Sequence, residues 1–338
     1  MKKRDANIEL FRVVCMYGIV LLHAMNDCGH HPGFISSPLQ ACVCAFVFIS
    51  GYYGIRFSFV KLFKLYAVGL WCSLVAFVAL EVHEFGSVSI TGRKFAEFAA
   101  FFCKGNWFLH AYAFMMMVVP MINHVCASAV NGDVAQRKKV VAVLAPFLLL
   151  VFGWSAADET PLLSKLMWPT VSGFGDHTPL TLIGIYVVAR LYRIFDLGSR
   201  MTTRMLLLLV PVLAVLACLG FSSYNSIVQV AQGACLFELF RRIKCINGVC
   251  ATSITWLAGS MFPVLLLHGH GRFFRVVEAW ESALIDAGHS MFFVCIVVSL
   301  AIFLASCVVD MPRRLLLGVV RGCISQHEAS KTVYKCRC

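Results

Sequence analysis

The sequence predicts an all-α protein: a polytopic integral membrane helical bundle of about ten transmembrane helices, with the N- and C-termini cytoplasmic. Its 338 residues are 60% hydrophobic and only 14% charged, whereas soluble domains carry about 45–50% apolar and about 25% charged residues. Most of the 29 Lys and Arg fall in alternate connections between apolar runs. By the positive-inside rule these connections and both termini lie in the cytoplasm, so the net charge of +12 needs no nucleic-acid partner.

Hydropathy and the charged connections together locate the spans. They are predicted near residues 10–26, 39–57, 65–83, 107–123, 140–157, 172–191, 205–221, 225–240, 254–270 and 290–309. The basic start lacks a small-residue cleavage site after its apolar run, so we expect an uncleaved first span rather than a signal peptide. Residues 1–322 then form one membrane domain, and residues 323–338 form a short cytoplasmic tail.

The first span carries Arg12 and His23, two groups that a bilayer disfavours. An arginine within a span costs roughly 2.5–3.5 kcal/mol on insertion scales, which favours a functional role. Eleven residues make about three helical turns, so both side chains leave one face about 16 Å apart along the axis. This spacing predicts a polar track through the membrane. The alternative is that Arg12 pairs with Glu9 at the cytoplasmic edge while His23 is hydrated at the opposite edge.

The second span ends with Ser50 and Gly51, and a basic turn follows it. A Ser-Gly pair in an apolar run allows close helix approach, or a break beside a cavity. Lys61 and Lys64 lie three residues apart on one helix face, next to Arg56. This turn is suited to the phosphates of a nucleotide-like cofactor, or it is a topology signal with lipid contacts.

Two later spans carry further candidate side chains. Trp107 opens the fourth span at the outer boundary, where aromatic residues commonly anchor a helix. His268 and His270 end the ninth span, but residues two apart point to opposite sides of a helix, so they are a poor metal pair.

Spacing gives no support for a metal site, and we expect none. A zinc site would have to combine His23, His30, His31, His268 and His270, which follow no zinc-binding pattern. Asp176 and His177 lie at the start of the sixth span as a helix cap, or as an acid/base pair.

Five motifs, in this order, resemble elements of the acyltransferase-3 family, the polytopic membrane acyltransferases that modify bacterial glycans. They are RDANIELFRVVCMYGIVLLH, FVFISGYYGIRF, VKLFKLY, NWFLHAY and SMFPVLLLHGH, between residues 4 and 270. Arg12 and His23 keep the family's spacing. Lys61 and Lys64 stand where the family usually has two arginines. Lysine lacks the paired N–H groups with which arginine binds a phosphate through two hydrogen bonds. Pro263 interrupts the ninth span before His268.

The resemblance implies that residues 1–322 form a membrane acyltransferase domain in the bacterial cytoplasmic (inner) membrane. It implies transfer of an acyl group, usually acetyl, from acyl-CoA to a hydroxyl of a cell-envelope or exported glycan or a lipid-linked saccharide. The expected donor-binding residues are Arg12, Ser50, Lys61, Lys64 and Trp107.

The catalytic residues expected from the same resemblance are His23, Arg12 and His268. His23 is the expected general base for the acceptor hydroxyl, or the carrier of a transient acyl group. His268 orients the acceptor or relays protons.

Two other functions stay open. The chain is a transporter or flippase if the Arg12–His23 track is a substrate path, although no internal repeat is visible and intramembrane carboxylates are few. It is an inactive relative if it only assists a polysaccharide assembly machine.

Overall fold

The computed structural model describes residues 5–27, 33–87, 91–130, 132–158, 177–221, 223–244 and 246–335. These ranges are helical and contain no strand, which confirms the all-α class. Six helical segments are long and apolar enough to cross a membrane. They are Ala6–Asn26, Phe59–Phe85, Trp107–Val130, Val134–Ala157, Gly248–His268 and Met291–Gly318.

Each of the ten predicted spans overlaps a helix in its described part, and the ninth overlaps two, α12 and α13, but not every helix has spanning length. The elements are α1 (Ala6–Asp27), α2 (Gly33–Ser36), η1 (Ser37–Gln40), α3 (Ala41–Tyr53), α4 (Phe59–Phe85), α5 (Gly92–Gly105), α6 (Trp107–Val130), α7 (Val134–Asp158), α9 (Pro179–Ile194), η3 (Leu197–Arg200), α10 (Thr203–Cys218), α11 (Ile227–Arg241), α12 (Gly248–Ala258), α13 (Met261–His268), α14 (Gly271–Asp286) and α15 (Met291–Lys335). Helices α3, α9, α10 and α11 have 13 to 16 residues. They reach about 20–24 Å, less than the roughly 30 Å of a bilayer core. Ten spans therefore stay a prediction.

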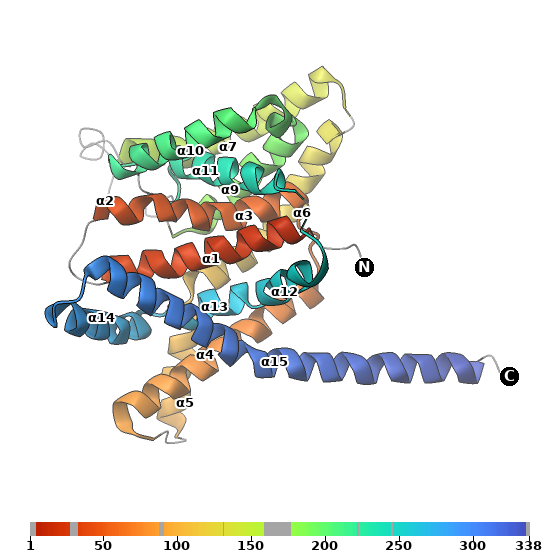
Figure 1. The fold of residues 1–338 in the computed structure, drawn as a ribbon. Coiled ribbons are helices and arrows are strands. Elements are labelled where there is room, and N and C mark those ends of the chain that lie inside the picture. Colours follow the sequence, from red (N-terminus) through yellow and green to blue (C-terminus); the bar gives the residue numbers. More distant parts are fainter. Residues whose placement is uncertain are drawn as a thin grey trace.

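The two termini lie at the same end of the bundle, which we call the terminal end (Figure 1). Helix α1 runs from this end to the opposite one, the far end. Asn7 fixes the start of α12 beside the start of α1, since its Nδ2 donates to the carbonyl of Ile243 (2.7 Å) and its Oδ1 accepts from the amide of Ile246 (3.3 Å). The predicted tail continues α15 as far as Lys335, and this part projects beyond the bundle.

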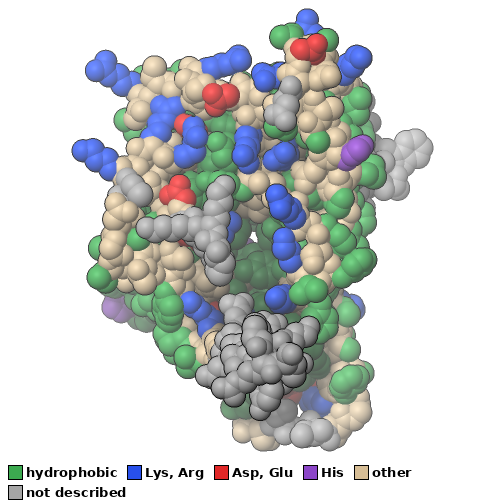
Figure 2. Space-filling view, turned by 90° about the vertical axis from the view of Figure 1, so that its right-hand side faces the viewer, with side chains coloured by type: hydrophobic (Ala, Val, Ile, Leu, Met, Phe, Trp, Pro, Cys, Tyr) green, Lys and Arg blue, Asp and Glu red, His purple; other side chains and the backbone are tan. Residues whose placement is uncertain are grey.

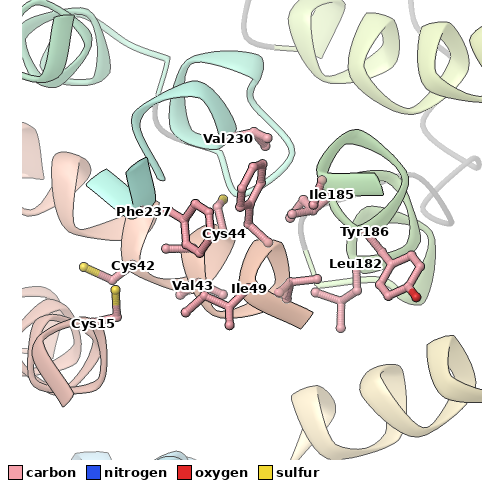
Figure 3. Close-up of a cluster of buried hydrophobic side chains, with 14 of the residues drawn as sticks. Cys15, Cys42, Val43, Cys44, Ile49, Leu182, Ile185, Tyr186, Val230 and Phe237 are labelled. Atoms are coloured by element: carbon pink, nitrogen blue, oxygen red, sulfur yellow. The ribbon is translucent and has the colours of Figure 1, made fainter. Parts of the chain in front are cut away.

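Helices α3, α9 and α11 pack their apolar side chains into one cluster (Figure 3). The close helix approach that Ser50-Gly51 predicts is present between α3 and α9. A Cβ atom added at Gly51 would lie 2.6 Å from the carbonyl oxygen of Tyr186 and 2.7 Å from the Cβ of Ala189. No side chain larger than hydrogen fits there without moving a backbone.

The ninth predicted span is broken before Pro263, not at it. Helix α12 ends at Ala258 and α13 begins at Met261, so Pro263 occupies the first turn of α13, where a missing N–H costs no helical hydrogen bond. The Ser260 hydroxyl at the break donates to the buried carboxylate of Asp310 on α15 (2.8 Å). The break thus sets the direction in which α13 carries His268.

Candidate functional site

His23 and His268 lie together at the far end of the bundle. Their ring centroids are 5.1 Å apart, with the planes inclined at 48°. His23 is half-buried in the last turns of α1, and His268 is the buried last residue of α13. Phe274 of α14 packs edge-on against His23 at 4.9 Å. The structure therefore brings two of the three predicted catalytic residues into one site.

The hydrogen bond of His268 defines its tautomer. Its Nδ1 lies 2.5 Å from the carbonyl oxygen of Val264. A carbonyl only accepts, so Nδ1 carries the proton and Nε2 keeps a lone pair. That Nε2 and the Nδ1 of His23 are both buried without a hydrogen-bond partner. Leaving one such group unpaired costs about 1–3 kcal/mol.

A cavity of about 380 Å³ lies beside His23, near the lower limit of the roughly 300–1,000 Å³ typical of ligand pockets. Amide side chains of Asn26, Gln40 and Asn106 reach it from three elements. Trp107, a predicted donor-binding residue, also lines it. Trp107 is thus part of a pocket wall rather than only a membrane anchor.

Two aromatic neighbours of Trp107 complete this wall. The ring of His177 lies 4.7 Å from Trp107 and 5.1 Å from Tyr224, nearly perpendicular to each. Asp176, which was paired with His177 in the sequence prediction, lies outside the described residues. Tyr224 was missed by the sequence analysis because it stands in a short connection with no recognisable motif.

Arg12 lies near the other end of α1. Its Nη1 is 3.4 Å from Glu9 Oε1, and its side chain is 33% exposed, so the pairing expected from the structural alternative is present. The Tyr112 hydroxyl of α6 is hydrogen-bonded to the hydroxyl of Ser50 (3.1 Å). Ser50 thus links α3 to α6.

The terminal end is strongly basic. Figure 2 looks onto it and shows Lys and Arg side chains around a hollow with hydrophobic side chains inside. Arg193 donates to the carbonyl of Tyr52 (2.9 Å), and Arg241 donates to the Tyr52 hydroxyl (3.1 Å). Cations at a helix C-terminus are stabilising, which explains part of this gathering at the end of α3. In the sequence, Arg193 and Arg241 are distinguished only as part of the positive charge that predicts cytoplasmic connections.

Lys61 and Lys64 lie on the exposed start of α4, close after the end of α3. The Lys61 ammonium donates to the carbonyl of Arg56 (2.8 Å) and so closes the turn that leads into α4. Both lysines belong to the basic terminal end and not to the histidine site.

Five carboxylates are buried among the described residues: Glu9, Glu81, Glu238, Glu281 and Asp310. Besides Glu9 with Arg12, Lys94 and Arg272 hold Glu81, Arg241 and Arg242 hold Glu238, and Arg313 holds Asp310. The Glu81 pairs join α4 to α5 and α14, whereas the Glu238 and Asp310 pairs each lie within one helix or at its end.

His270 takes no part in the histidine pair. It stacks on Phe101 with ring centroids 3.5 Å apart. The described residues contain no group of three or more His, Cys, Asp or Glu that could hold a metal ion. His30 and His31 lie outside them.

The fold and site define a helical protein with six apolar helices of membrane-spanning length and a histidine pair beside a polar cavity. No model of a known protein family, no curated protein and no solved structure matches this chain. The likeness to the acyltransferase-3 family therefore rests on the five sequence motifs.

Proposed function

We propose that this protein is a membrane O-acyltransferase of the acyltransferase-3 type, with about ten spans and both termini cytoplasmic, in a bacterial inner membrane. It transfers an acyl group, typically acetyl, from acyl-CoA to a hydroxyl of a cell-envelope or exported glycan or a lipid-linked saccharide. One observation supports this best. His23 and His268 lie far apart in the sequence, yet they form a pair beside a cavity that Trp107 lines.

The donor and acceptor are assigned to opposite ends of the bundle. Acyl-CoA carries several phosphates, which favours the basic terminal end with Arg12, Lys61 and Lys64, and Arg193 and Arg241 add to this charge. Its long pantetheine arm then extends along the interior past Ser50 toward His23, about 16 Å from Arg12 along α1. The acceptor enters the cavity at the far end.

His23 acts as the general base. It removes the proton of the acceptor hydroxyl, and the oxygen attacks the thioester carbonyl. The tetrahedral intermediate expels the CoA thiolate, which receives the proton from His23, so the products are the glycan ester and free CoA. In the variant with an acyl-histidine, the unprotonated nitrogen of His23 attacks the thioester carbonyl and the CoA thiolate leaves. The acceptor hydroxyl then attacks the acyl-imidazolium, which releases neutral His23, and the hydroxyl proton neutralises the thiolate.

His268 positions His23. Its Nδ1 is held by Val264, so its Nε2 can accept a hydrogen bond from Nδ1 of His23. That bond would place the proton of neutral His23 on Nδ1 and leave its Nε2 free to act as a base. The same logic of a base oriented by a third group operates in other nucleophilic sites.

Transport is less well supported. Proton coupling needs an intramembrane carboxylate that can change its protonation. Glu81, Glu238 and Asp310 are each engaged by arginine or lysine, and such an ion pair would have to be broken before the carboxylate could carry a proton. The buried Glu281 of α14 is therefore the carboxylate that a test of transport would substitute.

The test uses purified full-length protein in detergent, where no gradient exists. Acetyl-CoA is added, and release of the free CoA thiol is followed over time. An acyltransferase cleaves the thioester slowly to water, and faster with an acceptor glycan, whereas the His23→Ala variant does not. A transporter releases no thiol under either condition, which would refute the proposal.

A further inference from the structure

We infer that the cavity beside His23 is a subsite for a single uncharged sugar ring and that Gln40 recognises the hydroxyl groups of that ring. The inference deepens the proposed function, on which it rests, because the ring is the part of the acceptor that is acylated. Four features of the cavity support it.

The first feature is an unpaired amide. Gln40, the last residue of η1, lines the cavity, and its Oε1 is buried without a hydrogen-bond partner. A buried acceptor without a partner is unfavourable, so a ligand that donates a hydrogen bond there gains affinity.

The second feature is the set of polar groups around the cavity. Asn26 and Asn106 add two more carboxamides, and His23 adds an imidazole. Carboxamides both donate and accept, which matches the hydroxyl, a group that also does both. A ring that bears several hydroxyls can therefore be read from several sides by side chains of α1, η1 and the residue before α6.

The third feature is the aromatic wall. Trp107 and Tyr224 lie with nearly parallel rings, 6.2 Å between centroids and 22° between planes, and both line the cavity. Pockets for small molecules combine such apolar surfaces with a few placed polar groups. The C–H faces of a sugar ring suit the wall, while its hydroxyls suit the amides.

The fourth feature is charge and size. Among the described lining residues there is no Lys, Arg, Asp or Glu. A carboxylate or phosphate would lose its hydration there without a counter-charge, so an uncharged ring is favoured. A volume of about 380 Å³ is near the lower limit of roughly 300 Å³ for ligand pockets, which suits a single sugar ring.

The test measures binding without any acyl donor. Saturation-transfer NMR is recorded on the purified full-length protein with the methyl glycosides of glucose, galactose, mannose and N-acetylglucosamine, and with methyl glucuronide as the charged probe. We expect transfer to at least one neutral glycoside and none to the glucuronide. Gln40→Leu should weaken the Kd by about tenfold, because the ring loses its partner.

The matched control is Gln232→Leu. Gln232 is a buried glutamine of α11 whose Oε1 is also unpaired, but it does not line the cavity, so its substitution should leave the Kd unchanged. If Gln40→Leu does not fold, Gln40→Met replaces it, because Met has a similar length and shape.

Three results would overturn the inference: no transfer to any neutral glycoside, equal transfer to the glucuronide, or an unchanged Kd in the folded Gln40 variant. Thiol release from acetyl-CoA is measured on the same preparation. Glycoside binding without thiol release would keep the subsite and refute acyl transfer. Thiol release without glycoside binding would keep acyl transfer and refute the subsite.

Discussion

At the scale of single residues, the proposed acyl transfer depends on how two histidines are oriented. His268 is fixed by Val264, and its free Nε2 lies next to a ring whose Nδ1 also lacks a partner. The roles of the two histidines are therefore unequal. His23 lines the cavity and meets the substrate, whereas His268 acts through His23.

Substitution of His268 tests this positioning role. We expect His268→Leu to lower kcat by about 100-fold or more, with an unchanged KM for acetyl-CoA, because the base loses its orientation. His268→Gln should recover part of the rate, since the Gln Oε1 supplies an acceptor near the position of Nε2. Equal rates for the Leu and Gln variants would contradict the role.

Arg12 is either a structural partner of Glu9 or a ligand of the donor phosphates, and the KM for acetyl-CoA separates these two roles. If Arg12 is a phosphate ligand, Arg12→Ala should raise the KM for acetyl-CoA about 10- to 100-fold. This rise corresponds to the loss of one charge-assisted hydrogen bond, worth about 1.5–3 kcal/mol. Arg93→Ala is the control, because Arg93 is 89% exposed on α5. An unchanged KM in Arg12→Ala would reduce Arg12 to the partner of Glu9.

The sequence located some of these residues and missed others for physical reasons. Helical periodicity and the cost of charge in a bilayer single out Arg12 and His23 without any structure. No local pattern could reveal that His268 faces His23, since their contact depends on the α12–α13 break. Gln40 and Tyr224 have ordinary sequence surroundings, and only the cavity distinguishes them.

At the scale of helices, the contact of α3 with α9 depends on a missing side chain. Gly51→Ala places a methyl group against the backbone of Tyr186, and overpacking of this kind costs about 1–3 kcal/mol. Gly153→Ala in α7 is the matched control, since nothing lies within 4 Å of its added Cβ. There the alanine should stabilise by about 0.5–1 kcal/mol through helix propensity.

Thermal unfolding in detergent measures both changes. The Tm should fall in Gly51→Ala and stay the same or rise in Gly153→Ala. A Gly51→Ala protein with the Tm of the wild type would contradict the close packing of α3 on α9.

Helix positions were predictable from apolar runs, and so were the lengths of α10 and α11, but not those of α3 and α9. Hydropathy predicted spans over residues 39–57 and 172–191, whereas α3 has 13 residues and α9 has 16. Polar ends such as Arg193 and Arg241 look like loop residues in the sequence, although they end the helices. Pro263 was the visible signal for a break, whereas the helix is interrupted at Gly259 and Ser260.

At the scale of the whole molecule, the two ends differ in chemistry. The terminal end is basic, and the far end holds the imidazoles and the cavity. The charge asymmetry that predicts cytoplasmic termini also separates the proposed donor site from the acceptor site. The sequence could predict this polarity because Lys and Arg are counted without knowledge of packing.

Two native cysteines report the orientation. Cys250 is exposed near the start of α12 at the terminal end, and Cys103 is exposed on α5, near the residues of the far end. A membrane-impermeant maleimide should modify Cys103 in intact cells and Cys250 only in inverted vesicles, as read by peptide mass spectrometry. The opposite pattern, or modification of both from one side, would contradict the assigned topology.

The central claim is that His23 performs acyl transfer. The most direct measurement follows label from radioactive acetyl-CoA into endogenous glycan, in membranes that carry equal amounts of the wild type, His23→Ala or His124→Ala. His124 is an exposed histidine of α6 and serves as the control. If His23 performs the transfer, we expect labelled glycan with the wild type and His124→Ala and none with a folded His23→Ala. Equal labelling with His23→Ala would contradict the claim.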